Sequence, residues 1–216
     1  MGGTVETDSG VWTATDLVTR FGAIVLTRVR HDPLPGRATE EDLLRVNEGH
    51  DALCELVDGA LVEKAMGNYE SLLAMALGRF LSEIVADRDL GVVLGPDGML
   101  RLRSGLVRLP DLSFISWQRL PNRRIPASAI WDVAPDLAVE ILSRSNTREE
   151  MERKLLEYFA AGVRLVWYVE PKLRQVLAYT TPEHPLFVEY SQTLDGGDVL
   201  PGFSLPLAKL FITIAG

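Results

Sequence analysis

The chain has 216 residues, of which 47% are apolar and 24% are charged, and its formal net charge is −8 at pH 7. This length and composition are typical of one globular domain with a substantial core, and they exclude a largely disordered chain. The acidic balance opposes non-specific binding to nucleic acid, because Lys and Arg supply most of the affinity for phosphates. Any nucleic-acid function therefore requires a locally basic surface.

Several absences narrow the class of protein further. The single cysteine, Cys54, cannot form an internal disulfide, and its apolar neighbours indicate a buried, inert thiol. No run approaches the roughly 18 apolar residues that a membrane span requires. The first ten residues, MGGTVETDSG, include acids and lack an apolar stretch, which is not the pattern of a secretory signal. The expectation is a cytoplasmic protein without a membrane partner.

An N-terminal extension, partly flexible, is predicted over residues 1–36. It contains a short helix at Ala14–Phe21 and an apolar, strand-like run at Ala23–Val29, followed by a Pro/Gly break. Thr39 then caps a helix, because TEEDLLRV has a hydroxyl at the N-cap, acids in the first turn and Asp42 three residues after the cap.

A hairpin and a long helix are predicted next. Cys54–Lys64 alternates on both sides of Asp58-Gly59, which is the strongest short hairpin signal. Asn68–Val85 has apolar residues at the i, i+3, i+4 spacing of a helix that packs on one side. Gly91–Leu94 and Met99–Leu102 are expected to pair as a second hairpin that turns at the PDG tripeptide between them.

The second half of the chain predicts further strands and one crossover. Val107–Ser116 is expected to contain a strand that begins at Pro110, because proline cannot donate to a central ladder. The stretch Ala134–Val169 predicts a strand, a polar turn, an amphipathic helix and a second strand. Gln175–Thr180 and Leu186–Tyr190 predict an edge hairpin, and the chain closes with a loop and a short apolar turn.

This order of elements determines the expected fold class. Antiparallel strands come first and a strand–helix–strand unit comes later, which predicts an α/β fold with a mixed β-sheet flanked by helices. The single crossover is expected to be right-handed. A single domain is predicted over residues 37–216.

One carboxylate lies inside an otherwise apolar strand. The segment DLAVEIL places Glu140 on the face opposite Leu137, Val139 and Ile141. An ionised carboxylate in an apolar setting costs several kcal/mol or more unless it is paired or neutralised. Near the carboxyl end of a strand–helix–strand unit, it also lies where ligands usually bind in open α/β sheets. Some other group must therefore compensate its charge.

Two side chains are candidates for that compensation. Lys154 lies about 60° from Met151 on the helical wheel and can direct its ammonium toward the sheet; the alternative is an i, i+4 pair with Glu150. Asp111 follows a proline on a second strand, and carboxylates on neighbouring strands suit Mg²⁺ or Mn²⁺. The spacing equally allows Asp111 to cap a turn and Glu140 to pair with Lys or Arg.

The segment from residue 101 to residue 124 is locally basic. It contains six arginines against Asp111 alone, a local charge of +5. Because the segment flanks Asp111, it is a candidate nucleic-acid surface, and the alternative is a solvated loop. The arginines expected to contact nucleic acid are Arg101, Arg103, Arg108, Arg123 and Arg124.

These motifs resemble a known family. Pro110-Asp111, Glu140-Ile141-Leu142 and Lys154 are similar, in this order, to the signature of the Uma2 endonuclease family within the PD-(D/E)XK superfamily. TEEDLL, CELVDGALVEK, LVRLPDLSFIS, APDLAVEILS and YFAAGVRLVWYVEP also match in order, over residues 37–205. The resemblance implies a restriction endonuclease-like fold with a metal-dependent phosphodiesterase centre at a split in the sheet.

The resemblance also implies roles for single residues. Asp111 corresponds to the aspartate of the PD motif, and Glu140 to the acid of (D/E)XK. Leu142 stands where the superfamily pattern has lysine, and the resemblance implies that Lys154 on the following helix replaces it. Glu70 corresponds to an acid of the first core helix, a position where many members have histidine.

Two more acids lie near the site by the same analogy, Glu55 and Glu63, and both are expected to be solvated. The alternative is that either one supports the metal ligands from behind.

The function implied by the resemblance is metal-dependent endonuclease activity on nucleic acid, with DNA as the expected substrate. Asp111, Glu140 and Glu70 are expected to hold Mg²⁺ or Mn²⁺, and Lys154 to stabilise charge on the phosphate. The alternative is a non-catalytic binding or regulatory module that retains the fold, which the net charge and Leu142 favour. A homodimer is compatible with the class, because such nucleases often pair to cut two strands, but no sequence feature demonstrates one.

Overall fold

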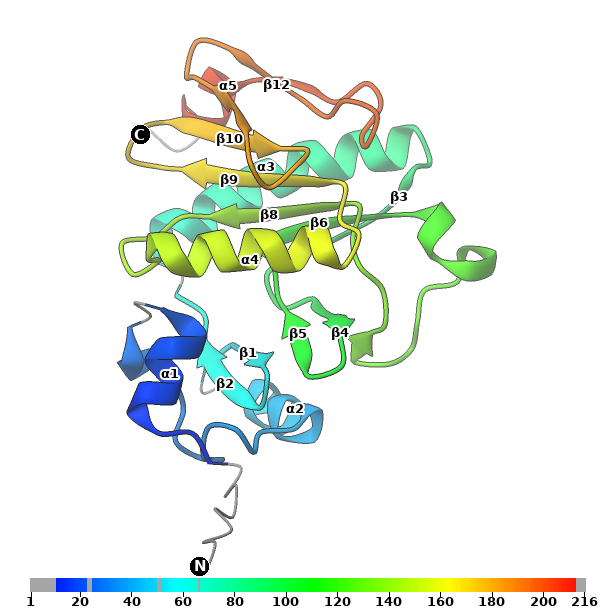
Figure 1. Ribbon diagram of the computed structural model, residues 1–216. Helices are drawn as coiled ribbons and strands as arrows, with labels where there is room; N and C mark the ends of the chain where they lie inside the picture. Colours follow the sequence, from blue (N-terminus) through cyan, green and yellow to red (C-terminus); the bar gives the residue numbers. More distant parts are fainter. Residues whose placement is uncertain (1–10, 23–24, 50–51, 66, 213–216) are drawn as a thin grey trace, which may run out of the picture.

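The computed structural model describes residues 11–22, 25–49, 52–65 and 67–212. Two β-sheets organise the described chain (Figure 1). The larger sheet consists of β3 (Gly91–Leu94), β6 (Leu112–Ser116), β8 (Leu137–Ile141), β9 (Leu165–Glu170), β10 (Gln175–Tyr179) and β11 (Pro185–Val188). The smaller sheet consists of β1 (Cys54–Val57), β2 (Ala60–Glu63), β4 (Met99–Arg103), β5 (Leu106–Arg108) and β7 (Ile130–Trp131).

Helices cover the two sheets from several sides. They are α1 (Ala14–Phe21), α2 (Glu40–Glu48), α3 (Asn68–Asp87), α4 (Arg148–Ala160) and α5 (Leu207–Ile212). Three 3-10 turns are η1 (Leu26–Arg28), η2 (Trp117–Arg119) and η3 (Pro121–Arg123), and a separate hairpin is formed by β12 (Thr193–Asp195) and β13 (Ser204–Pro206). No helix of the described ranges is long and apolar enough to cross a membrane; the cytoplasmic location stays a prediction.

The larger sheet has the strand order β11-β10-β9-β8-β6-β3. Only β8 and β9 are parallel, and α4 connects them, which confirms the mixed sheet with one strand–helix–strand crossover. The alternation expected for β8 is also confirmed. Leu137, Val139 and Ile141 lie in the core that contains α3 and α5, while Ala138 packs with the residues of α4.

The smaller sheet has the strand order β2-β1-β5-β4-β7 and packs with α1 and α2 below the larger sheet (Figure 1). The predicted helix Ala14–Phe21 and the cap at Thr39 are confirmed; Thr39 Oγ1 accepts from the Asp42 amide and Asp42 Oδ2 accepts from the Thr39 amide. Cys54 is buried, as expected, and burial raises the pKa of its thiol to about 11. The domain boundary at residue 36 stays a prediction.

Four expected strands differ from the structure. Gly91–Leu94 and the strand at Met99 do not pair; β3 pairs with β6, and β4 with β5 and β7. Val107–Ser116 contains two strands, β5 and β6, which belong to different sheets, because the chain crosses between the sheets at Pro110. Residues 26–28 of the expected strand Ala23–Val29 form η1, and residues 23–24 lie outside the described residues.

The turn of the β1–β2 hairpin requires a glycine. Gly59 has φ +88° together with φ +49° at Asp58, as a two-residue hairpin turn demands. A Cβ at Gly59 would lie 2.9 Å from the carbonyl carbon and oxygen of Gly36, and the Gly59 carbonyl accepts hydrogen bonds from the amides of Gly36 and Ala38. The hairpin turn therefore holds the loop that precedes α2.

Gly59→Ala should lower the free energy of unfolding by about 2 kcal/mol or more, because the left-handed conformation and the close backbone contact both oppose a methyl group. Gly197→Ala is the matched control. Gly197 has φ +53°, but a Cβ there meets nothing within 4 Å, so only the conformational cost of about 1 kcal/mol applies. Urea denaturation of both variants measures the difference, and equal losses would contradict the contact argument.

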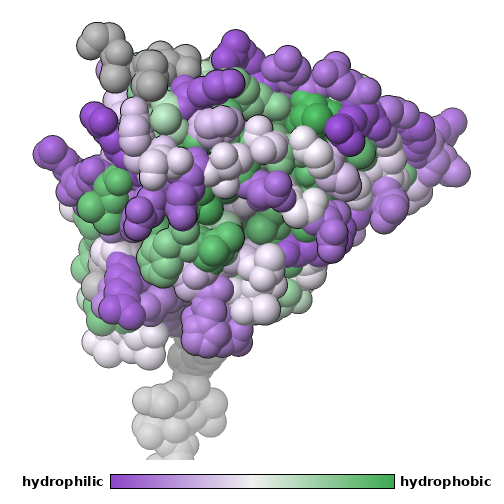
Figure 2. Space-filling view, turned by 90° about the horizontal axis from the view of Figure 1, so that it is seen from above, coloured by the Kyte–Doolittle hydropathy of each residue, from purple (hydrophilic) through white to green (hydrophobic). Residues whose placement is uncertain are grey.

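The upper face of the molecule, as oriented in Figure 1, carries both apolar and hydrophilic side chains. Figure 2 shows small apolar patches on it, separated by hydrophilic side chains. The largest exposed apolar side chains of the edge strand β11 are Leu186 and Phe187, which are 68% and 54% exposed. A homodimer stays a prediction.

Candidate active site

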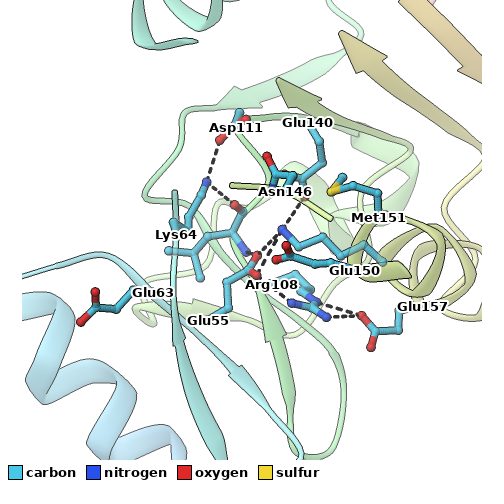
Figure 3. Close-up of polar contacts among 12 residues, drawn as sticks. Glu55, Glu63, Lys64, Arg108, Asp111, Glu140, Asn146, Glu150, Met151 and Glu157 are labelled. Carbon is cyan, nitrogen blue, oxygen red and sulfur yellow. Dashed lines mark hydrogen bonds and ion pairs between the residues drawn. The ribbon is translucent and has the colours of Figure 1, made fainter. Parts of the chain in front are cut away.

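Buried charged side chains gather where the two sheets meet α4 (Figure 3). Each of them is at most 5% exposed, and together they come from β1, β5, β8, α4 and the residue directly before β6. They are Glu55, Arg108, Asp111, Glu140, Glu150 and Lys154. Buried charges require partners, and the pairings among these residues define the candidate site.

Lys154 is the centre of this cluster. Its Nζ lies 3.1 Å from Glu140 Oε1 and 3.2 Å from Glu55 Oε2, so the ammonium is directed to the sheet. Tyr158, one turn further along α4, donates its hydroxyl proton to the same Glu140 oxygen at 2.5 Å. The alternative of a Lys154–Glu150 pair does not occur, because Arg28 binds Glu150 through both terminal nitrogens, at 2.9 and 3.0 Å.

The protonation of the Lys154–Glu140 pair follows from burial and neighbours. Burial raises the pKa of Glu140; Lys154 opposes this rise and the nearby Asp111 carboxylate adds to it, so the pKa lies above its usual value. Burial alone would lower the pKa of Lys154, but Glu140 and Glu55 raise it above the ordinary lysine value. The Lys154 amine therefore stays protonated and acts as a fixed positive charge.

Asp111 has its own lysine. Lys64, directly after β2, places Nζ 2.9 Å from Asp111 Oδ1 and also donates to the carbonyl oxygen of Leu109 at 2.5 Å. The other oxygen, Oδ2, accepts a hydrogen bond of 2.7 Å from the amide of Ile141. The predicted residue Asp111 is thus fixed to the strand of Glu140. Sequence reasoning missed Lys64, whose only signal was its place in the CELVDGALVEK segment.

Glu55 and Arg108 form a second buried pair beneath Lys154. Arg108 donates to Glu55 Oε2 at 2.7 Å and from Nε to Glu157 Oε2 at 2.9 Å, and the Leu109 amide donates to Glu55 Oε1. Burial opposes ionisation of Glu55, but Lys154 and Arg108 outweigh it and lower its pKa. The expectation of a solvated Glu55 is therefore wrong.

Glu63, in contrast, is partly exposed. It pairs with Arg30 at 3.0 Å and points away from the cluster (Figure 3).

The arginines expected to contact nucleic acid mostly pair with acids of the chain. Arg101 binds Glu40 through two hydrogen bonds of 2.6 and 2.7 Å, Arg103 binds Asp58, and Arg123 binds Asp89. Arg108 is buried in the pair with Glu55. Arg124 is exposed and has no ion pair with any residue that the structure describes.

A groove with a volume of about 1010 Å³ adjoins the site. It lies at the carboxyl ends of the parallel strands β8 and β9, beside the first turns of α3 and α4, and β10 forms part of its wall. Leu142 and Ser143, which follow Glu140 on the chain, line it, and so does the predicted residue Glu70. Glu70 is thus on the groove wall and makes no hydrogen bond to the described residues of the buried cluster.

Comparisons with known proteins agree with this geometry. The family model Uma2, described as "Putative restriction endonuclease", matches residues 40–208. The chain belongs to the Uma2 family. No curated protein matches the Uma2 chain. A crystal structure of "a putative nuclease belonging to DUF820" from Anabaena variabilis ATCC 29413 is similar, with a TM-score of 0.66, 19% identity, and coverage of 75% of this chain and 91% of that one.

These findings confirm two expectations for the Uma2 protein. The resemblance to the family is confirmed, and so is the restriction endonuclease-like fold, with mixed sheets flanked by helices. The family model also supports the general assignment of this chain as a nuclease.

The donor set of the Uma2 protein fits a divalent ion held by two carboxylates. In the described part of the chain no three Asp, Glu, His or Cys side chains converge on one point, so the set of Asp111, Glu140 and Glu70 is not assembled. Mg²⁺ commonly takes one or two carboxylates and keeps several waters. Glu140 Oε2 accepts no hydrogen bond from any described residue, and Asp111 is bound to the same strand. Asp111 and Glu140 are therefore suitable ligands.

Proposed function

We propose that this Uma2 protein is a metal-dependent endonuclease that hydrolyses phosphodiester bonds, with DNA as its substrate. The buried contact of Lys154 with Glu140, with Asp111 beside it, is the observation that supports this most. Buried ion pairs rarely stabilise a fold relative to apolar packing. Two carboxylates and two lysines at the junction of the sheets, Lys64 being the second, therefore favour a functional role over a structural one.

Asp111 and Glu140 would hold the ion, which we propose to be Mg²⁺ or Mn²⁺. When bound, such an ion lowers the pKa of a coordinated water and neutralises charge on the phosphate. Glu70, predicted as a third ligand, lies on the groove wall beside the end of β8. The proposal places the ion on the first two carboxylates and leaves Glu70 as a ligand to be tested.

The remaining residues position the two carboxylates or stabilise charge on the phosphate. Lys154 stays charged, so its role is electrostatic stabilisation of the phosphate rather than removal of a proton from water. Tyr158 and Lys154 together hold Glu140 Oε1, which leaves Oε2 for a ligand. Asp111 is fixed through both of its oxygens, with Lys64 at Oδ1 and the Ile141 amide at Oδ2.

A second candidate function is a binding or regulatory module that retains the fold without cleavage. The net charge of −8 favours it, and so do Leu142 in place of the usual lysine and the pairing of Arg101 and Arg103 with acids of the chain. The two functions differ in whether the metal-loaded protein cuts nucleic acid.

Cleavage of supercoiled plasmid DNA tests the proposal. Wild type is incubated with Mg²⁺, Mn²⁺ or EDTA, and Glu140→Ala is purified in parallel. We expect nicked and linear products only with wild type and a divalent ion. Equal cutting by both proteins would assign the activity to a contaminant. Binding of Mn²⁺ by wild type, measured by calorimetry, without any cutting would favour the binding module.

A further inference from the structure

The groove beside the active site is lined by several basic side chains that the nuclease proposal does not use. Four basic and three acidic side chains line it: Arg144, Arg148, Lys172 and Arg174, with Glu70, Glu152 and Glu170. Arg148 pairs with Glu152 at 2.6 Å. Arg144 and Lys172 are exposed and form no ion pair with any residue in the described ranges. In an acidic chain, these are cations available to an anionic ligand.

Aromatic and apolar side chains form the rest of the groove. Tyr69, at the start of α3, is 41% exposed, and Tyr179 on β10 is half-buried. Leu173 and Leu177 add apolar surface, and Ser143 adds a hydroxyl group. Cations beside aromatic faces are the combination with which proteins bind single strands, because bases stack on the rings while the cations follow the backbone.

The groove is lined by residues that neighbour Glu140 in the chain and in the sheet. Ser143 follows Glu140 by three residues, which is about 10 Å along an extended chain. Tyr168, which lines the groove, is the cross-strand partner of Glu140 and donates its hydroxyl proton to the Met151 carbonyl oxygen at 2.7 Å. A nucleic-acid strand lying in the groove would therefore lie against Ser143 and Tyr168, the residues closest to Glu140 in the groove wall.

We propose that this groove binds an unpaired nucleic-acid strand, with its phosphates on Arg144 and Lys172 and a base stacked on Tyr69. This inference rests on the proposed nuclease function and names its substrate as single-stranded or locally unpaired. Bases inside a duplex are stacked on each other and cannot reach a ring in the groove wall. It also moves the nucleic-acid contact away from the arginines of residues 101–124, most of which are engaged with acids.

Fluorescence anisotropy with a labelled single-stranded oligonucleotide and its duplex, in EDTA, tests the groove without catalysis. Wild type is expected to bind the single strand more tightly. Arg144→Ala/Lys172→Ala should weaken that binding about tenfold or more and reduce the steepness of its salt dependence by about 1.4, since each cation contributes about 0.7 on a single strand. Tyr69→Ala should weaken it about tenfold, and Tyr69→Phe should restore it.

Two further double variants complete the experiment. Arg45→Ala/Arg79→Ala removes the same charge from exposed positions outside the groove and should leave binding unchanged. Arg123→Ala/Arg124→Ala tests the surface expected from the sequence. Unchanged binding by the groove variant, an equal loss in either of these double variants, tighter binding of duplex, or no binding by wild type would each overturn the inference. If binding depended on the groove residues but the protein did not cleave plasmid DNA, the groove would remain a binding site for single strands and the proposed nuclease function would be rejected.

Discussion

Lys154→Met should lower the rate of metal-dependent plasmid cleavage about 100- to 1,000-fold, the cost of removing one fixed group that stabilises a transition-state charge. The effect is large because Lys154 is buried between Glu140 and Glu55, where water cannot replace its charge. Single-turnover cleavage with Mn²⁺ measures the loss. Circular dichroism at the assay temperature establishes that the variant is folded.

Binding of Mn²⁺ separates this electrostatic role from a structural one. Without the ammonium, Glu140 and Glu55 lose their shared cation, so calorimetry should show Mn²⁺ binding that is no weaker than in wild type. Arg45→Ala, which removes an exposed cation on α2, should cleave at the wild-type rate. A loss of cleavage that is matched by an equal loss of Mn²⁺ affinity would contradict the assignment.

Arg108→Leu should lower the free energy of unfolding by about 3–5 kcal/mol. Arg108 is the partner that Glu55 and Glu157 share in the interior, and its removal leaves Glu55 with Lys154 and the Leu109 amide. For a chain of this length, such a loss lowers the melting temperature by roughly 6–20 °C. Urea denaturation and thermal melting both measure it.

Arg103→Leu is the matched control, because Arg103 lies on β4, the strand that pairs with the β5 strand of Arg108. Its guanidinium is 52% exposed and pairs with Asp58 at 2.7 Å. Exposed pairs contribute at most about 1 kcal/mol, so this variant should remain close to wild type. If both variants lost the same stability, burial would not be the cause.

Local signals in the sequence determined most of the elements. Thr39 and Asp42 form the expected capping box, and Asp58-Gly59 forms the expected turn, because both depend on residues only three positions apart or fewer. Asn68–Val85 lies within α3, and Ala134–Val169 contains β8, α4 and β9 as expected, because their apolar periodicity matches one helix and two buried strands. The need of Glu140 for a compensating group followed from the cost of a buried charge alone.

The strand partners were decided by the tertiary structure. Gly91–Leu94 and Met99 are close in sequence, and a hairpin between them was the simplest expectation. The two strands instead belong to different sheets, because β3 pairs with β6 and β4 pairs with β5. A strand's sequence specifies which of its faces is apolar, but not which strand will form hydrogen bonds with its edge.

The candidate site also combines residues that the sequence identified with contacts that only the tertiary structure revealed. From the sequence came Asp111, Glu140 and Lys154, each marked by a charge at an apolar position or by the family motif. The contacts of Lys64 and Glu55 with these residues required the tertiary structure, because both lie on a hairpin of the smaller sheet that is more than 40 positions away from its partners in the chain. Such pairings depend on how two sheets pack, and no local pattern of residues records that.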